Sequence, residues 1–118
     1  MKVLITGSRS IKFIVYVCNI LDKEIADGDV VIQGGADGVD SLVLDWCNKF
    51  CKKDISWLTF EPIKKYNPNY YLHRNAEMIG LCDRVIAIWD GKSRGTKFTI
   101  DYAKARHKPI IIYNPFEK

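Results

Sequence analysis

Short runs of apolar, mostly β-branched residues alternate along the chain with segments in which apolar residues recur every three or four positions. Such runs are typical of buried strands, and the wider spacing is typical of a helix with one buried face. The runs predict strands over residues 2–6, 30–33, 55–60, 84–89 and 109–113. The segments between them predict helices over residues 11–26, 39–50, 72–81 and 96–106.

This regular alternation predicts a parallel sheet covered by helices on both faces. Because crossovers between parallel strands are right-handed, few strand orders remain. We expect an α/β fold with a doubly wound, Rossmann-like five-stranded sheet in the order 3-2-1-4-5. The 118 residues, 47% of them hydrophobic, suffice for one core, and no repeat or linker divides them. We therefore expect a single domain over residues 1–118, with Trp46 and Trp57 in its core.

Charge and cysteine content narrow the functional classes. The formal net charge of +4 is a mild excess that suits an anionic small ligand as well as nucleic acid. The four cysteines form no CxxC pair, so we interpret them as free, buried thiols in a reducing compartment and expect no metal site. No apolar run reaches the roughly 18–20 residues of a membrane span, and "MKVLITG" is typical of a strand rather than a signal peptide. We expect a cytoplasmic protein without a membrane partner.

Polar and glycine-rich loops follow the predicted strands. In a doubly wound sheet the ligand lies beyond the carboxyl ends of the strands, where the winding reverses, here between the first and fourth strands. The stretch "GGADGVD" after the second strand predicts a phosphate seat, because glycine permits close approach and the amides that open a helix favour anions. A tight turn with Asp37 as helix N-cap is the alternative. The predicted ligand-binding residues are Gly7, Ser8, Arg9, Gly34, Gly35, Gly38, Asp40, Arg74, Asn75, Asp90, Gly91, Ser93, Gly95 and Thr96.

Two standard nucleotide-binding motifs do not fit the sequence. A P-loop ending at Ser93 would need its first glycine where Ile86 stands, and the dinucleotide fingerprint would need a glycine at Gln33. Glu61, at the end of the third predicted strand, stands where a ribose-binding acid would lie. An ordinary surface carboxylate is the alternative for Glu61.

Several motifs together resemble a known family. They are "TGSRS", "GGADGVD", "HRNAEM", "CDRVIAIWDGKSRGT" and "KPIIIY". Their order and spacing are similar to those of the small SLOG proteins, Rossmann-like domains related to LOG-type phosphoribohydrolases and to DNA-processing proteins. The resemblance implies a nucleotide or nucleotide-derived ligand, with phosphate or sugar near Gly34, Gly35, Gly38, Gly95 and Thr96. It also implies that Arg74 lies in a segment that, in LOG enzymes, supports cleavage of an N-glycosidic bond.

The sequence departs from the LOG pattern at one catalytic position. LOG enzymes carry a glutamate three residues after the threonine of "GGxGT", and Thr99 stands there in this chain. Cleavage through an oxocarbenium-like state requires a positioned carboxylate. The candidate catalytic residues are therefore Arg74, Asp40 and Asp90, and LOG-type catalysis is not assigned.

Three functions remain open at this point. The first is a binding module for a nucleotide-like small molecule, and the second is a hydrolase or transferase of nucleoside monophosphates. The third is a single-stranded nucleic-acid binder, which requires a basic groove with aromatic side chains. Tyr66, Tyr70 and Tyr71, near basic residues, agree with that third function or with a subunit interface. We expect a homo-oligomer that binds a nucleotide-like molecule and uses no cofactor.

Overall fold

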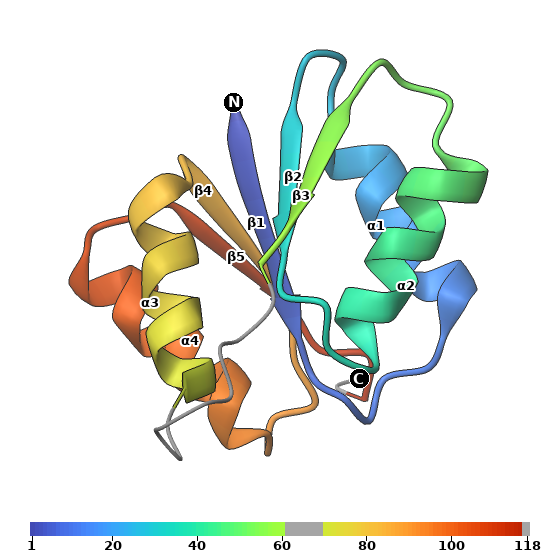
Figure 1. Cartoon of the computed structure of the whole chain (residues 1–118). Coiled ribbons are helices and arrows are strands. Elements are labelled where there is room, and N and C mark those ends of the chain that lie inside the picture. Colours follow the sequence, from blue (N-terminus) through green and yellow to red (C-terminus); the bar gives the residue numbers. More distant parts are fainter. Residues whose placement is uncertain (61–69, 117–118) are drawn as a thin grey trace.

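A five-stranded parallel sheet forms the centre of the computed structural model, which describes residues 1–60 and 70–116 (Figure 1). The strands lie in the order β3-β2-β1-β4-β5. Their bounds are Lys2–Gly7 for β1, Val30–Gln33 for β2, Ser56–Thr59 for β3, Arg84–Ile88 for β4 and Ile110–Tyr113 for β5. The predicted α/β fold and strand order are confirmed, and the fold is Rossmann-like.

Two pairs of helices cover the two faces of the sheet (Figure 1). On one face lie α1 and α2, and on the other lie α3 and α4. The helices span Ile14–Glu24 for α1, Val39–Asp45 for α2, Tyr70–Leu81 for α3 and Arg94–Ala105 for α4. A π-helical turn, η1, continues α2 over Trp46–Phe50. Among the described residues, no helix combines the length and apolar character needed to cross a membrane.

The alternation of side chains along β1 divides the core into two layers. Val3 and Ile5 pack with the residues of α1 and α2, whereas Leu4 packs with those of α3 and α4. Successive side chains of a strand point to opposite faces, and both faces of a central parallel strand are covered. The continuous apolar run of β1 is therefore buried on both sides, which fixes the carboxyl end of β1 at the centre of the sheet edge.

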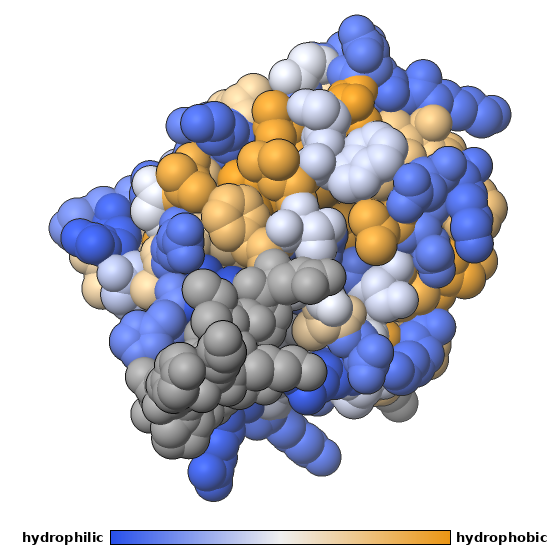
Figure 2. Space-filling view, in the orientation of Figure 1, coloured by the Kyte–Doolittle hydropathy of each residue, from blue (hydrophilic) through white to orange (hydrophobic). Residues whose placement is uncertain are grey.

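The two tryptophans predicted in the core differ in burial. Trp46 is fully buried, and its Nε1 donates a hydrogen bond to Asp22 Oδ1 at 2.9 Å. Trp57 is 37% exposed and belongs to neither core layer. The prediction that Trp57 lies in the core is wrong, because β3 is an edge strand. Apolar side chains accordingly show at the surface on the side of the molecule where β3 lies (Figure 2).

Substitution of the two tryptophans tests this difference. Trp46→Ala removes a fully buried indole and should lower the free energy of unfolding by about 3–5 kcal/mol. Trp57→Ala should lower it by less than half as much, because part of the Trp57 ring already contacts solvent. Urea denaturation of both variants measures the two changes, and equal losses would contradict the edge position of β3.

Candidate functional site

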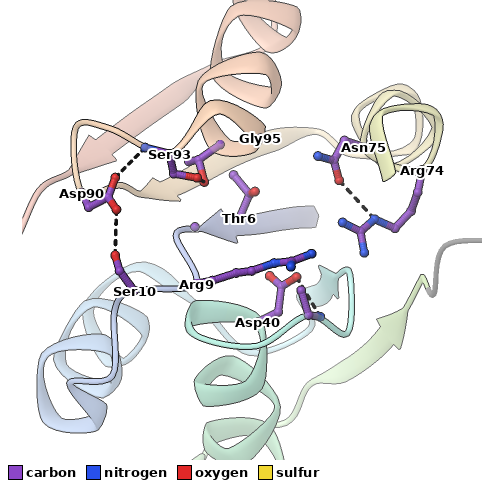
Figure 3. A pocket seen from close by; sticks show the side chains of 12 residues that line it. Thr6, Arg9, Ser10, Asp40, Arg74, Asn75, Asp90, Ser93 and Gly95 are labelled. Atoms are coloured by element: carbon purple, nitrogen blue, oxygen red, sulfur yellow. Dashed lines mark hydrogen bonds between the residues drawn. The ribbon is translucent and has the colours of Figure 1, made fainter. Parts of the chain in front are cut away.

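A cavity of about 480 Å³ opens at the carboxyl edge of the sheet, where the loops after β1 and β4 diverge (Figure 3). Its size lies within the range of about 300–1,000 Å³ that small-ligand pockets occupy. Most of the predicted ligand-binding residues line it: Gly7, Arg9, Asp40, Arg74, Asn75, Asp90, Ser93, Gly95 and Thr96. The structure therefore brings these nine residues together around one cavity, and their binding of a ligand stays a prediction.

Three lining residues were missed by the sequence analysis. Thr6, Ser10 and Ala36 lie within the same polar loops as the predicted residues. Thr6 and Ser10 flank the "GSR" triplet, and their hydroxyl groups could have identified them as candidate ligand-binding residues. Ala36 carries no polar side chain, so nothing in its chemistry marked it.

The remaining predicted residues, Ser8, Gly34, Gly35, Gly38 and Gly91, do not line the pocket. Gly38 adopts a φ of +76°, and a Cβ on it would lie 2.5 Å from Ser8 O. The absence of a side chain there lets the loop after β2 pack against the loop after β1. Packing between these two loops therefore explains why a glycine stands at position 38. Direct ligand contact by these five residues stays a prediction.

Asp37 is not the N-cap residue of α2, although that was the alternative to a phosphate seat at this loop. Gly38 is the N-cap residue, and no side chain caps this helix end. Asp37 is exposed, so its expected role as N-cap is wrong. The carboxylate that organises this loop belongs instead to Asp40, whose Oδ2 accepts a hydrogen bond from the Ala36 amide at 3.2 Å.

Arg74 lies against the wall of the pocket through contacts with two elements. Its Nη1 donates to Gly34 O at 2.6 Å, and its Nε donates to Asn75 Oδ1 at 3.2 Å. A Cβ on Gly34 would lie 2.8 Å from the guanidinium carbon. Gly34 therefore provides the space that Arg74 occupies, and this glycine acts on the pocket through the arginine.

Asp90 structures the loop between β4 and α4. Its Oδ1 accepts hydrogen bonds from the amides of Lys92 and Ser93, each at 2.8 Å, and its Oδ2 accepts one from Ser10 Oγ at 2.7 Å. Burial alone would raise the pKa of this carboxyl, but the hydrogen bonds outweigh burial and lower the pKa to about 2. Asp90 is thus ionised at neutral pH and is unsuited to donate a proton.

Asp40 has the opposite ionisation behaviour. Its side chain is almost completely buried on the pocket wall. Burial raises its pKa from 3.8 to about 6, although backbone hydrogen bonds from Ala36 and Gly34 and the charges of Arg74 and Arg9 favour the ionised form. The side chain of Arg9 extends toward the same part of the pocket (Figure 3). A carboxyl that titrates close to neutral pH beside two arginines is typical of functional sites.

The first turn of α4 forms the wall opposite Arg74 (Figure 3). Ser93 precedes the helix, and its Oγ lies 3.2 Å from Thr96 Oγ1. The amides of a first helical turn have no acceptor within their own helix, and they favour a bound anion. Thr99, at the position of the LOG glutamate, is fully buried and donates its hydroxyl hydrogen to Gly95 O at 3.1 Å. The side chain at position 99 therefore bonds to its own helix and does not reach the pocket.

Metal binding and the candidates Glu61 and Tyr66 remain to be considered. Within the part of the chain that the structure describes, no three histidine, cysteine, aspartate or glutamate side chains lie close enough together to hold a metal ion. Glu61 and Tyr66 lie outside the described residues. The pocket offers guanidinium groups, hydroxyl groups and helix amides, which are groups that bind anions.

Comparison with known proteins agrees with the Rossmann-like class of the fold. No protein-family model matches the chain, and no curated protein matches its sequence. Among solved structures, DNA processing protein A from Helicobacter pylori, described for a unique single-stranded DNA binding mode, has a TM-score of 0.65 and 24% sequence identity. The match covers 95% of this chain and 64% of the neighbour, so this chain spans less than two thirds of that protein. The likeness shows the fold.

The buried carboxyl of Asp40 predicts a specific pH dependence of stability. Because its folded pKa of about 6 exceeds the unfolded value of 3.8, the folded state binds the proton more tightly. Ionisation of Asp40 therefore lowers stability as the pH rises from about 4 to about 6, by about 3 kcal/mol in total. Asp40→Asn abolishes this loss, so its stability relative to the wild type should increase by that amount between pH 4 and pH 7.

Chemical denaturation at pH 4 and at pH 7 measures this effect in both proteins. The difference between variant and wild type isolates Asp40, because the other titrating groups are common to the two chains. If the free energy of unfolding changes with pH by the same amount in both proteins, the raised pKa of Asp40 is contradicted.

Proposed function

We propose that the pocket binds a phosphorylated nucleoside, with its phosphate between the first turn of α4 and the guanidinium groups of Arg9 and Arg74. The observation that supports this most strongly is that two arginines and a helix start line one cavity at the point where the winding of the sheet reverses. Ligands of such sheets bind at that point, and phosphates bind at helix starts. The resemblance of the loop motifs to the SLOG proteins supports the same ligand class.

Each polar group of the pocket has a place in this proposal. Arg74 is oriented by Gly34 O and by Asn75, so its planar guanidinium is prepared for a bidentate phosphate contact. At the other wall, Gly95 allows close approach to the helix amides. Asp40 accepts hydrogen bonds and does not favour an anion, so we expect a hydroxyl or amino group of the sugar or base, rather than the phosphate, to contact it.

The hydrogen bonding of the pocket carboxylates favours binding of a nucleotide over its hydrolysis. Asp90 accepts three hydrogen bonds and stays ionised, and Thr99 bonds to its own helix. Of the two described carboxyls that line the pocket, Asp40 has the pKa nearer to neutral, but it already accepts hydrogen bonds from backbone amides of its own loop. We therefore propose a binding module, and we expect no release of free base from the bound nucleotide.

Single-stranded DNA is the second candidate ligand. The structural neighbour is described as binding single-stranded DNA. In this chain, exposed cations occupy the loops that border the pocket, namely Arg9 and Lys12 after β1 and Lys92 after β4. A phosphate backbone that crosses these loops would meet favourable charge, while one nucleotide of the strand occupies the pocket.

Two substitutions that act on the same guanidinium test the nucleotide site. Arg74→Ala should weaken the binding of thymidine or adenosine 5′-monophosphate by about 10- to 100-fold, because a hydrogen bond to a charged group contributes roughly 1.5–3 kcal/mol. Gly34→Ala should also weaken binding, because the new methyl group displaces Arg74. The double variant should bind no more weakly than Arg74→Ala alone, since both changes remove one interaction.

Isothermal titration calorimetry measures the four affinities, and chromatography of the same mixtures checks for free base. Gly80→Ala is the matched control, because Gly80 lies in α3 like Arg74 but a Cβ there meets nothing within 4 Å. Additive losses, or an equal loss for the nucleoside without phosphate, would contradict the proposed role of Arg74. Release of free base that depends on Asp40 would favour the hydrolase.

A further inference from the structure

Two phenylalanines from distant parts of the chain form an exposed pair. Phe13 precedes α1, and Phe116 follows β5. Their ring centroids lie 5.7 Å apart, with an edge-to-face angle of 66°. The side chains remain 47% and 54% exposed, and neither belongs to a core layer. The pair therefore presents aromatic surface to solvent.

The pair lies near two loops that contribute residues to the pocket. Phe13 is three residues beyond Ser10, whose hydroxyl group binds Asp90 inside the pocket (Figure 3). The backbone of Phe116 donates to Asn114 Oδ1 at 2.9 Å. Asn114 in turn lies next to Gly91, since its Nδ2 is 3.3 Å from the position of a Cβ there. Residues 114–116 thus lie near the loops that follow β1 and β4 (Figure 1).

Exposed cations occur in the two loops near the pair. Lys12 is adjacent to Phe13, and Lys92 is adjacent to Gly91, and both lysines are exposed. Arg9 leads from the same loop into the pocket. Aromatic rings interleaved with cations bind single strands, because bases stack on the rings while phosphates follow the charges.

We propose that Phe13 and Phe116 form a base-stacking subsite next to the pocket, so that the carboxyl edge binds a single-stranded oligonucleotide of two or more nucleotides. The inference rests on the proposed function, because the first nucleotide occupies the pocket. The second base stacks on the exposed rings, and the linking phosphate lies near Arg9 and Lys12. A duplex does not bind in this way, because its bases are stacked on one another.

Affinity as a function of oligonucleotide length tests the subsite. Thymidine 5′-monophosphate occupies the pocket alone, whereas a 5′-phosphorylated thymidine hexamer also reaches the phenylalanines. The double variant Phe13→Ala/Phe116→Ala should bind the hexamer about 5- to 100-fold more weakly, the range expected for one stacked base. Its affinity for the monophosphate should equal that of the wild type. Both affinities are measured by calorimetry at one fixed salt concentration.

Two further variants control for loss of structure. Phe50→Ala removes a phenylalanine of similar exposure, 52%, at the end of η1, and it should leave the hexamer affinity unchanged. Phe13→Trp retains an aromatic surface, and it should retain the hexamer affinity. Loss of hexamer binding in both control variants would overturn the stacking subsite.

The wild-type measurements separate the two proposals. Monophosphate binding with equal hexamer affinities in wild type and double variant would overturn the subsite and leave the pocket proposal standing. Hexamer binding that depends on the phenylalanines, without any monophosphate binding, would contradict the nucleotide pocket and support the stacking surface. If sedimentation shows a wild-type dimer and a monomeric double variant with unchanged hexamer affinity, the pair is a contact between two copies of the chain, and the subsite is overturned.

Discussion

Ser8 holds together the segments from which the pocket is built. It follows β1 and is fully buried. Its amide donates to Ile88 O at 3.0 Å, and its hydroxyl oxygen accepts the amide of Asp90 at 3.0 Å. Its carbonyl accepts the amides of Ile11 and Val39, each at 3.3 Å. One residue therefore joins the end of β4, the approach to α1 and the start of α2, and the pocket depends on this arrangement.

The hydrogen bonds of Ser8 support a pocket that contains a buried carboxyl with a raised pKa. Asp40 is buried with a raised pKa, and Arg74 is held beside it by a backbone carbonyl and a neighbouring amide. Burial of this carboxyl lowers the stability of the protein at neutral pH, and such destabilising groups are frequent in functional sites. By contrast, Asp90 accepts three hydrogen bonds, from its own loop and from Ser10, and its negative charge stabilises the local fold of the loop.

The sequence predicted the sheet, and it predicted that the loops lining the cavity would meet at one edge, because both follow from local patterns. Alternating strands and helices determine the topology, and the carboxyl ends of parallel strands meet at one edge. The edge exposure of Trp57 was missed because an apolar strand sequence does not reveal its position in the sheet. Gly34 and Ser8 were interpreted as ligand contacts, since nothing local shows that Arg74 and Asp90 lie against them. The Phe13–Phe116 pair depends on a contact across almost the whole chain.

Amide chemical shifts measured by NMR during titration with thymidine 5′-monophosphate test the central claim most directly. The claim is that the carboxyl-edge pocket binds a nucleotide. Saturable shifts should concentrate in the loop after β1, around Ala36, and in the first turn of α4 at Gly95 and Thr96. Shifts confined to the amino-terminal ends of the strands, or an unchanged spectrum at millimolar nucleotide, would contradict the account.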